Sequence, residues 1–209
     1  MKKRKKRKWK LFLVVFLLTL FFMRPRYEPN RESVHSREDF FVAFAPLAQE
    51  VGRKYDLYPS VILAQAALES NFGESELSRN YNNYFGIKGK GVVLPTMEME
   101  GERKMAVEDG FRTYDSARES FYDYGKLIAK APRYGPVREA ESAEAYAMAL
   151  HPAGYSTNPR YGEILLQMIR DYNLMIYDEN KGASASFLFA ESVLKIPRPW
   201  RSINSVYYI

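Results

Sequence analysis

The sequence contains no cysteine and only two histidines among its 209 residues. The absence of cysteine excludes disulfide bonds, thiolate catalysis and any metal site that uses a thiolate ligand. His35 lies in a polar, proline-containing stretch and His151 at the end of an expected helix, and neither belongs to a cluster of metal-ligand residue types. We therefore expect no metal and no cofactor.

The excess of positive over negative charge is confined to the N-terminus. Residues 1–10 hold eight of the 31 lysines and arginines, and removing these eight charges from the net charge of +6 leaves −2 for residues 11–209. A nearly neutral folded part offers no basic surface to a phosphate backbone. We therefore expect no nucleic-acid partner.

The basic residues 1–10 precede an apolar run at residues 11–23, "LFLVVFLLTLFFM", in which only Thr19 is polar. This order is typical of an export signal. The residues that follow, Arg24-Pro25-Arg26, are not the small residues that a signal peptidase prefers. We therefore expect an uncleaved single-pass signal anchor, with residues 1–10 in the cytoplasm and the rest of the chain outside it. The run is shorter than the roughly 20 apolar residues of a typical spanning helix, and the alternative is a cleaved signal that yields a secreted protein.

After a polar linker at residues 24–36, helical patterns dominate residues 37–177, and residues 178–209 form a tail of no identifiable role. Helices are predicted at 37–55 with a kink or restart at Pro46, from 59 to a stop near Gly73, at 115–130 with a Ser116 capping box, at 141–150 with a Ser142 cap, and at 158–172 with an Asn158 cap.

Residues 80–114 lose the helical period. The stretch "GKGVVLPTMEMEGERKMAV" has glycine-rich turns and short alternating runs, which predict a small antiparallel hairpin that reverses near Glu100-Gly101-Glu102. The expected fold class is therefore α+β, mainly helical, with a small β-hairpin lobe and a preceding N-terminal membrane-anchor helix.

The most apolar predicted helix ends in a carboxylate. Val61 to Leu68 hold only Val, Ile, Leu and Ala apart from Gln65, and Glu69 follows. A carboxyl walled by apolar side chains keeps its proton to higher pH, because burial penalises the charged form. A general acid for a glycosidic bond needs that property, and Glu98 or Glu100 on the hairpin would supply a second, ionised carboxylate. The alternative is that Glu69 is an ordinary solvated helix end.

The segment "PSVILAQAALESNFGESELSRNYNNYFGIKG" resembles the glucosaminidase family of bacterial peptidoglycan hydrolases (glycoside hydrolase family 73). That family carries an A-Q-A-x-L-E-S-x-F/W-G helix end followed by an N-N-L/Y-F-G-I/V-K-G turn. The resemblance continues through "PTMEMEG", "FRTYDS", "PRYGPV" and "AGYSTNPRY", and so covers about residues 40–177.

The resemblance implies a lysozyme-like fold and hydrolysis of the β-1,4 bond after N-acetylglucosamine in peptidoglycan glycan strands. Glu69 falls on the family's general acid. Thr96-Met97-Glu98 matches a T-x-E pattern that carries the second acid, which favours Glu98 over Glu100. This second acid would either activate water or stabilise a positively charged intermediate formed with the substrate's acetamido group.

Substrate-binding candidates follow from the same motifs. Tyr155 and Asn158 lie on a G-Y-A/S-T-D/N-P motif, although Asn158 also suits a purely structural helix cap. Aromatic rings stack on sugar faces, and Phe72, Tyr84 and Phe85 are further candidates for the cleft, with a hinge between the two lobes as the equal alternative for Phe85. Tyr134 is a weaker candidate, and Tyr161 is expected in the core.

Two other functions remain open on the sequence. A lytic transglycosylase or muramidase shares the lysozyme-like core, but its Glu-Ser pair is typically followed by a G-L-M-Q-type motif, whereas "NNYFGIKG" follows here. A membrane-tethered wall-binding protein with an inactive cleft would not need both Glu69 and Glu98.

Overall fold

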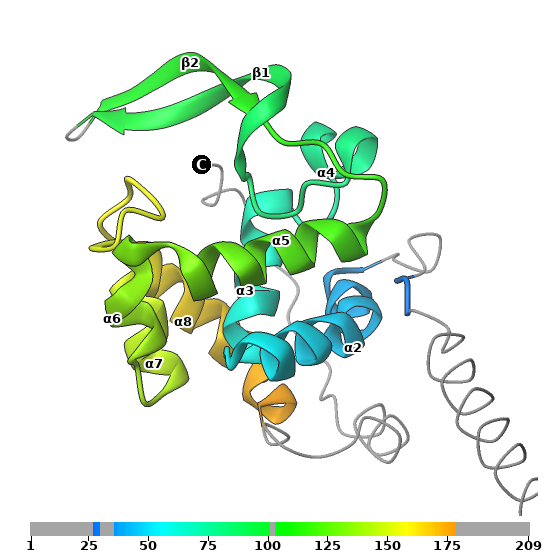
Figure 1. Ribbon diagram of the computed structural model, residues 1–209, viewed down its shortest axis with the longest axis vertical. Coiled ribbons are helices and arrows are strands. Elements are labelled where there is room, and N and C mark those ends of the chain that lie inside the picture. The colour runs from blue at the N-terminus through cyan, green and yellow to red at the C-terminus, as the bar shows by residue number, and fades with distance from the viewer. Residues whose placement is uncertain (1–26, 30–35, 101–102, 179–209) are drawn as a thin grey trace, which may run out of the picture.

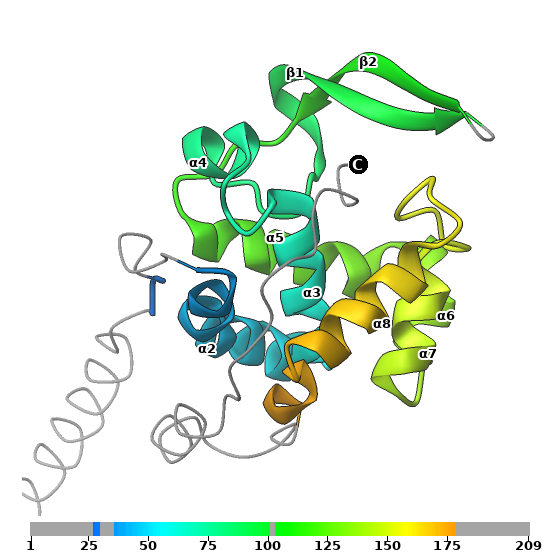
Figure 2. The same ribbon diagram turned by 180° about the vertical axis from the view of Figure 1, so that it is seen from behind.

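The computed structural model describes residues 27–29, 36–100 and 103–178, and the side chains at 97–106 lie outside that description. Figures 1 and 2 show the helices gathered into one body, from which a two-stranded hairpin projects. The elements in chain order are α2 (Arg37–Tyr55), α3 (Pro59–Ser70), α4 (Glu76–Tyr81), β1 (Lys88–Glu100), β2 (Arg103–Phe111), α5 (Ala117–Lys130), η2 (Pro132–Tyr134), α6 (Gly135–Arg138), α7 (Ala143–Leu150), α8 (Tyr161–Asp171) and η3 (Leu174–Tyr177). This confirms the mainly helical α+β class.

Helix α3 occupies the centre of the helical body. It packs against α2, α7, α8 and η3, and all of its residues except Glu69 are buried. A helix that is apolar on nearly every face is stable only when other elements surround it. The sequence of α3 therefore fixes its place at the core and leaves one carboxyl at its end.

The N-terminus of α3 is capped from a distant part of the chain. Tyr58 makes no side-chain cap, but the Asp178 carboxylate accepts from the Ser60 backbone N–H at 2.8 Å and from the Ser60 hydroxyl at 2.6 Å. A carboxylate at a helix N-terminus satisfies free N–H groups and interacts favourably with the helix dipole. Asp178, placed by the sequence analysis in the C-terminal tail, thus contacts the core helix.

Helix α2 runs as one helix from Arg37 to Tyr55 through Pro46, so of the predicted kink or restart the restart is wrong and the kink stays a prediction. Phe44, Ala45, Leu47 and Ala48 on both sides of the proline are at most 4% exposed. Burial of these side chains offsets the hydrogen bond and the steric fit that a proline costs inside a helix.

Two other predicted helix ends are also displaced. Helix α3 stops at Ser70 instead of near Gly73, because Asn71, Phe72 and Gly73 all have positive φ angles of 49°, 56° and 82°. Helix α8 begins at Tyr161 and not directly after Asn158, whose side-chain oxygen accepts from the Arg160 N–H at 2.9 Å in the preceding turn. The short α4 was not predicted at all.

The predicted caps of α5 and α7 are confirmed. The hydroxyls of Ser116 and Ser142 accept from the backbone N–H groups of Glu119 and Ala145, each three residues on. The returning bond of the Ser116 capping box differs, since the Glu119 carboxylate accepts from the Asp115 N–H. Gly125 allows α5 to approach α2 closely, because a Cβ there would lie 2.7 Å from a Val51 methyl carbon.

Strands β1 and β2 form the predicted antiparallel hairpin. Their register runs from Val92 opposite Phe111 to Glu100 opposite Arg103, with an irregularity between Lys88 and Val92. The chain therefore reverses after Glu100, as predicted.

Within the described residues, no helix has the length and apolarity that a bilayer span requires. The predicted anchor at 11–23 lies outside those residues, as do residues 1–10, most of the linker and residues 179–209.

Candidate active site

Glu69 is the one residue of α3 that reaches the protein surface. Its Oε1 accepts a hydrogen bond from the Tyr161 hydroxyl of α8 at 2.6 Å. Burial of the carboxyl raises the pKa of Glu69 to about 7, and the bond from Tyr161 opposes part of that rise. At neutral pH a large share of Glu69 carboxyls therefore keep a proton that they can donate.

The other carboxyl oxygen of Glu69 lies beside the base of the hairpin. A Cβ added at Gly86 would stand 3.7 Å from Oε2 of Glu69, and Gly86 has a φ of +60°, which side-chain-bearing residues rarely adopt. Glycine at this position keeps the loop in its turn and leaves space next to Oε2.

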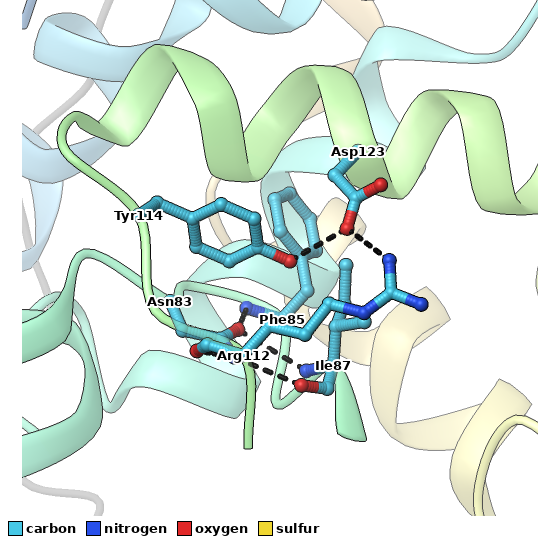
Figure 3. A network of polar contacts seen from close by, with 6 residues as sticks. All are labelled: Asn83, Phe85, Ile87, Arg112, Tyr114 and Asp123. Carbon is cyan, nitrogen blue, oxygen red and sulfur yellow. Dashed lines mark hydrogen bonds and ion pairs between the residues drawn. The ribbon is translucent and has the colours of Figure 1, made fainter. Parts of the chain in front are cut away.

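Asn83 holds the loop that leads into β1 (Figure 3). Its amide nitrogen donates to the carbonyls of Ile87 and Arg112 at 3.1 and 2.9 Å, and its oxygen accepts from the N–H groups of Phe85 and Ile87 at 3.3 and 3.1 Å. The side chain is 1% exposed, so these four bonds satisfy a buried amide. They join the start of β1 to the end of β2.

A second group of contacts ties the hairpin to α5 (Figure 3). Arg112 Nη1 and the Tyr114 hydroxyl each lie 2.7 Å from the same carboxylate oxygen of Asp123. These contacts hold the segments that enter and leave the hairpin against the helical body.

Glu98 lies in β1 with its backbone opposite Met105, and Glu100 lies opposite Arg103. The two residues share one face of the strand because side chains alternate along it. Their carboxyls belong to the side chains outside the described part of the structure, so the choice of Glu98 stays a prediction.

Two of the predicted cleft aromatics are buried. Tyr84 and Phe85 are 1% and 2% exposed, and the Phe85 ring stacks on the Tyr124 ring with centroids 4.2 Å apart. Neither ring presents a face to a sugar, so their assignment to the cleft is wrong in this structure. Both rings instead pack the core beneath the hairpin base.

Phe72 is partly exposed, but its ring faces are largely occupied. It meets Phe40 and Phe41 edge to face, and the Arg37 guanidinium lies 4.8 Å from its centroid. Asn158 is partly exposed and makes the turn described above, which supports its structural interpretation. Within the described part of the structure, the hydrogen bonds and ring contacts of these two residues go to partners other than Glu69.

Tyr155 lies close to the acid. Its hydroxyl donates to the Phe85 carbonyl at 3.1 Å, and its ring stacks on Tyr161 at 5.7 Å between centroids. Burial and the nearby charge of Glu69 hold the pKa of Tyr155 well above its usual value. Tyr155 is therefore a neutral, partly exposed phenol beside the candidate acid.

Sequence reasoning missed the contact made by Tyr161. The helical period placed this residue in the core, and it is indeed 0% exposed, but its hydroxyl bonds Glu69. Periodicity shows which way a side chain faces and not what a hydroxyl at its end will meet. The available signal was the Gln65–Glu69 spacing of four, which puts two polar groups on one face of an apolar helix.

A hollow of about 680 Å³ lies between α5 and the base of the hairpin, and its lining includes Tyr55, Lys90, Tyr122 and Lys126. It does not include Glu69, so the chemistry and not the volume locates the candidate site. In the described part of the chain, no three His, Asp or Glu side chains gather where a metal would bind.

Comparison with known proteins is consistent with this geometry. A model of the glucosaminidase family, described as mannosyl-glycoprotein endo-β-N-acetylglucosaminidase, matches residues 45–174. The exo-glucosaminidase LytG of Bacillus subtilis is 35% identical over 196 residues, which are 85% of this chain and 70% of LytG. A probable N-acetylmuramidase of Lactococcus lactis is 36% identical over 165 residues, which are 74% of this chain but 38% of that protein.

Among solved structures, the catalytic domain of the autolysin Auto from Listeria monocytogenes superimposes with a TM-score of 0.59 at 34% identity, over 70% of this chain and 90% of that domain. The family match spans more than half of the sequence and includes the helix that carries Glu69. The chain therefore belongs to the glucosaminidase family and is a glycoside hydrolase.

Proposed function

We propose that this protein hydrolyses the β-1,4 bond after N-acetylglucosamine in peptidoglycan glycan strands, with Glu69 as general acid. The observation that carries the proposal is the state of Glu69. It is a partly exposed residue at the end of a buried helix, and burial of its carboxyl raises the pKa to about 7. The names of LytG and Auto, a glucosaminidase and an autolysin, support the substrate class.

In this mechanism Glu69 gives its proton to the glycosidic oxygen as the bond from that oxygen to the anomeric carbon breaks. Water then adds to the anomeric carbon and loses a proton. Glu98 either accepts that proton or stabilises the positive charge while the substrate's own acetamido oxygen adds to the anomeric carbon. Tyr155, a neutral hydroxyl and ring beside Glu69, is the substrate-binding residue that the geometry supports best.

A second candidate is an N-acetylmuramidase, which the name of the Lactococcus relative favours. The two activities cut alternate bonds of the same strand and therefore expose different sugars. Purified peptidoglycan is digested, reduced with borohydride and analysed by mass spectrometry. Reduced N-acetylglucosamine at the new ends is the expected result. Reduced N-acetylmuramic acid would show a muramidase, anhydro-muramic acid a lytic transglycosylase, and no product an inactive wall-binding protein.

We also propose that residues 11–23 anchor the enzyme in the cell membrane, with the catalytic domain outside the cytoplasm. The support is the order of eight basic residues followed by thirteen residues without charge. A membrane-held hydrolase would meet the glycan strands on the outer side of the membrane.

A further inference from the structure

A chain of buried polar side chains leads from the core to Glu69. The Tyr161 hydroxyl, 2.6 Å from Glu69 Oε1, accepts from the Gln65 amide nitrogen at 3.1 Å. The Gln65 carbonyl oxygen accepts from the Tyr124 hydroxyl, which lies 3.0 Å from the Tyr146 hydroxyl. Gln65, Tyr124, Tyr146 and Tyr161 are each at most 1% exposed.

Each tyrosine hydroxyl in this series of hydrogen bonds has one proton to donate, and this determines which group is the donor in every bond. The Tyr161 hydroxyl donates its hydrogen bond to Glu69, so it accepts the bond from the Gln65 amide nitrogen. The Gln65 oxygen then faces Tyr124, whose hydroxyl donates to it. Tyr146 must therefore donate to Tyr124. All four bonds point towards Glu69, and such an ordered series polarises each of its members.

We propose that Gln65, Tyr124 and Tyr146 act as positioning residues that aim the Tyr161 hydroxyl at Oε1 of Glu69 and so reserve Oε2 for the catalytic proton. Oε2 is the oxygen beside Gly86 and the hairpin base. The inference rests on the proposed role of Glu69 and names the residues that decide which of its two oxygens donates. We call Tyr146, Tyr124, Gln65 and Tyr161 the relay.

The relay places four polar side chains in the core, where burial of a polar group is unfavourable unless it is hydrogen-bonded. Its members come from α7, α5, α3 and α8, and each brings a polar group that an apolar side chain of similar size would not. A purely structural role would need only that these groups satisfy one another. That role predicts a loss of stability on mutation but no change in how Glu69 titrates.

Tyr155 and Tyr161 are titratable side chains that interact electrostatically with Glu69. Burial first, and then the charge of Glu69, raises the pKa of both phenols well above the usual value, so both stay neutral over the working pH range. The hairpin carboxylates are the same in every relay variant. A change in the titration of Glu69 between variants therefore reports on the relay.

The test compares Tyr161→Phe, Gln65→Met and Tyr124→Phe with wild type. The readouts are the pH dependence of kcat/KM, kcat and KM at the optimum, and the midpoint of urea unfolding. A general acid loses activity as pH rises through its pKa. The hydrogen bond from Tyr161 stabilises ionised Glu69, so its removal raises the pKa of Glu69. The alkaline limb of the kcat/KM profile should therefore shift to higher pH by about one unit.

Gln65→Met and Tyr124→Phe should move the same limb in the same direction by smaller amounts, since they weaken that bond without removing it. For all three variants we expect kcat to fall by about tenfold or more and KM to change less than about twofold, because the substituted groups orient the acid and do not touch the sugar. Tyr177→Phe is the matched control, a tyrosine 8% exposed in η3 whose hydroxyl is outside the relay. It should leave the limb in place.

The inference is overturned if Gln65→Met and Tyr124→Phe lower stability while the limb stays where Tyr177→Phe leaves it. A titration of the Glu69 carboxyl by carbon-13 NMR, assigned by its loss in Glu69→Gln, gives the same answer for a variant with too little activity to assay. Full activity of Glu69→Gln would refute the proposed function itself. An inactive Glu69→Gln together with unmoved relay variants would refute the relay alone.

Discussion

Glu69 is the one ionisable residue in a helix whose other side chains are buried. A charged group in this environment loses hydration that no cation in the described part of the chain replaces. The protein tolerates this because the carboxyl stays protonated over much of the range up to neutral pH. A carboxyl with these properties costs stability at high pH.

The raised pKa predicts that the stability difference between Glu69→Gln and wild type depends on pH. The folded-state pKa of about 7 exceeds the ordinary value of 4.5, so the folded protein binds the proton more tightly than the unfolded chain. Stability from this group is full below about pH 4.5 and is lost as the pH rises towards 7. Relative to wild type, Glu69→Gln should therefore gain about 3 kcal/mol of unfolding free energy between pH 4 and pH 8.

Urea unfolding of both proteins at the two pH values measures this difference, and groups common to the two proteins cancel. A difference that stays constant with pH would show that Glu69 titrates as an ordinary exposed carboxyl.

The two hairpin acids give a second prediction at this scale. Glu98 and Glu100 share a strand face, and the T-x-E match selects Glu98. A carboxylate that orients water or stabilises developing charge acts in the transition state, so Glu98→Gln should lower kcat strongly and KM little. Glu100→Gln is the matched control and should cost far less. The assignment fails if Glu100→Gln is the more damaging change in steady-state kinetics.

The residues of the site were predictable to different degrees. Glu69 stands out because a carboxylate after eight nearly apolar residues is a visible break in pattern. Tyr84 and Phe85 were misplaced because residue type alone does not distinguish an aromatic ring that stacks on a sugar from one that packs in the core, as Phe85 does against Tyr124. Tyr161 and Gln65 were missed because their partners lie 92 and 96 residues apart and meet only in the fold.

At the scale of elements, local signals predicted the helices better than their ends. The caps at Ser116 and Ser142 form because a serine hydroxyl needs only a backbone N–H three residues on. Pro46 does not interrupt α2 because the side chains on both sides of it are buried in the core, and their burial stabilises the helix. Ser60 receives its cap from a residue 118 positions away, and no local pattern carries that information.

The distant cap makes a prediction for α3. Asp178→Ala removes two bonds, from the N–H and from the hydroxyl of Ser60, and should lower the free energy of unfolding by about 1–2 kcal/mol. Asp171→Ala, an exposed carboxylate at the end of α8, should change it by only a few tenths of a kcal/mol. Urea denaturation measures both, and equal effects would mean that Asp178 does not stabilise α3.

At the scale of the whole molecule, a fixed hairpin base and a buried central helix place the acid independently of the N-terminal residues. The contacts of Asn83, Arg112 and Asp123 all lie within residues 83–123, and those of Glu69 within residues 65–161. The catalytic domain should therefore fold and work without its proposed anchor.

Deletion of residues 1–26 tests this separation. The full chain should sediment with membranes and keep an N-terminal tag, while the shortened chain should be soluble and hydrolyse peptidoglycan at a similar rate. Immunoblots of membrane and soluble fractions, with an activity assay on each, report the outcome. Mature protein in the medium that begins near Arg24 would contradict the anchor and show a cleaved signal.

The central claim is that Glu69 donates the proton that breaks the glycosidic bond. The most direct measurement is the turnover of folded Glu69→Gln on purified peptidoglycan, followed by the release of new reducing ends at pH 6. The amide has nearly the same shape but no acidic proton, so the account predicts a loss of more than about 10²-fold. Turnover within about tenfold of wild type, in a variant whose circular dichroism matches that of the parent, would contradict it.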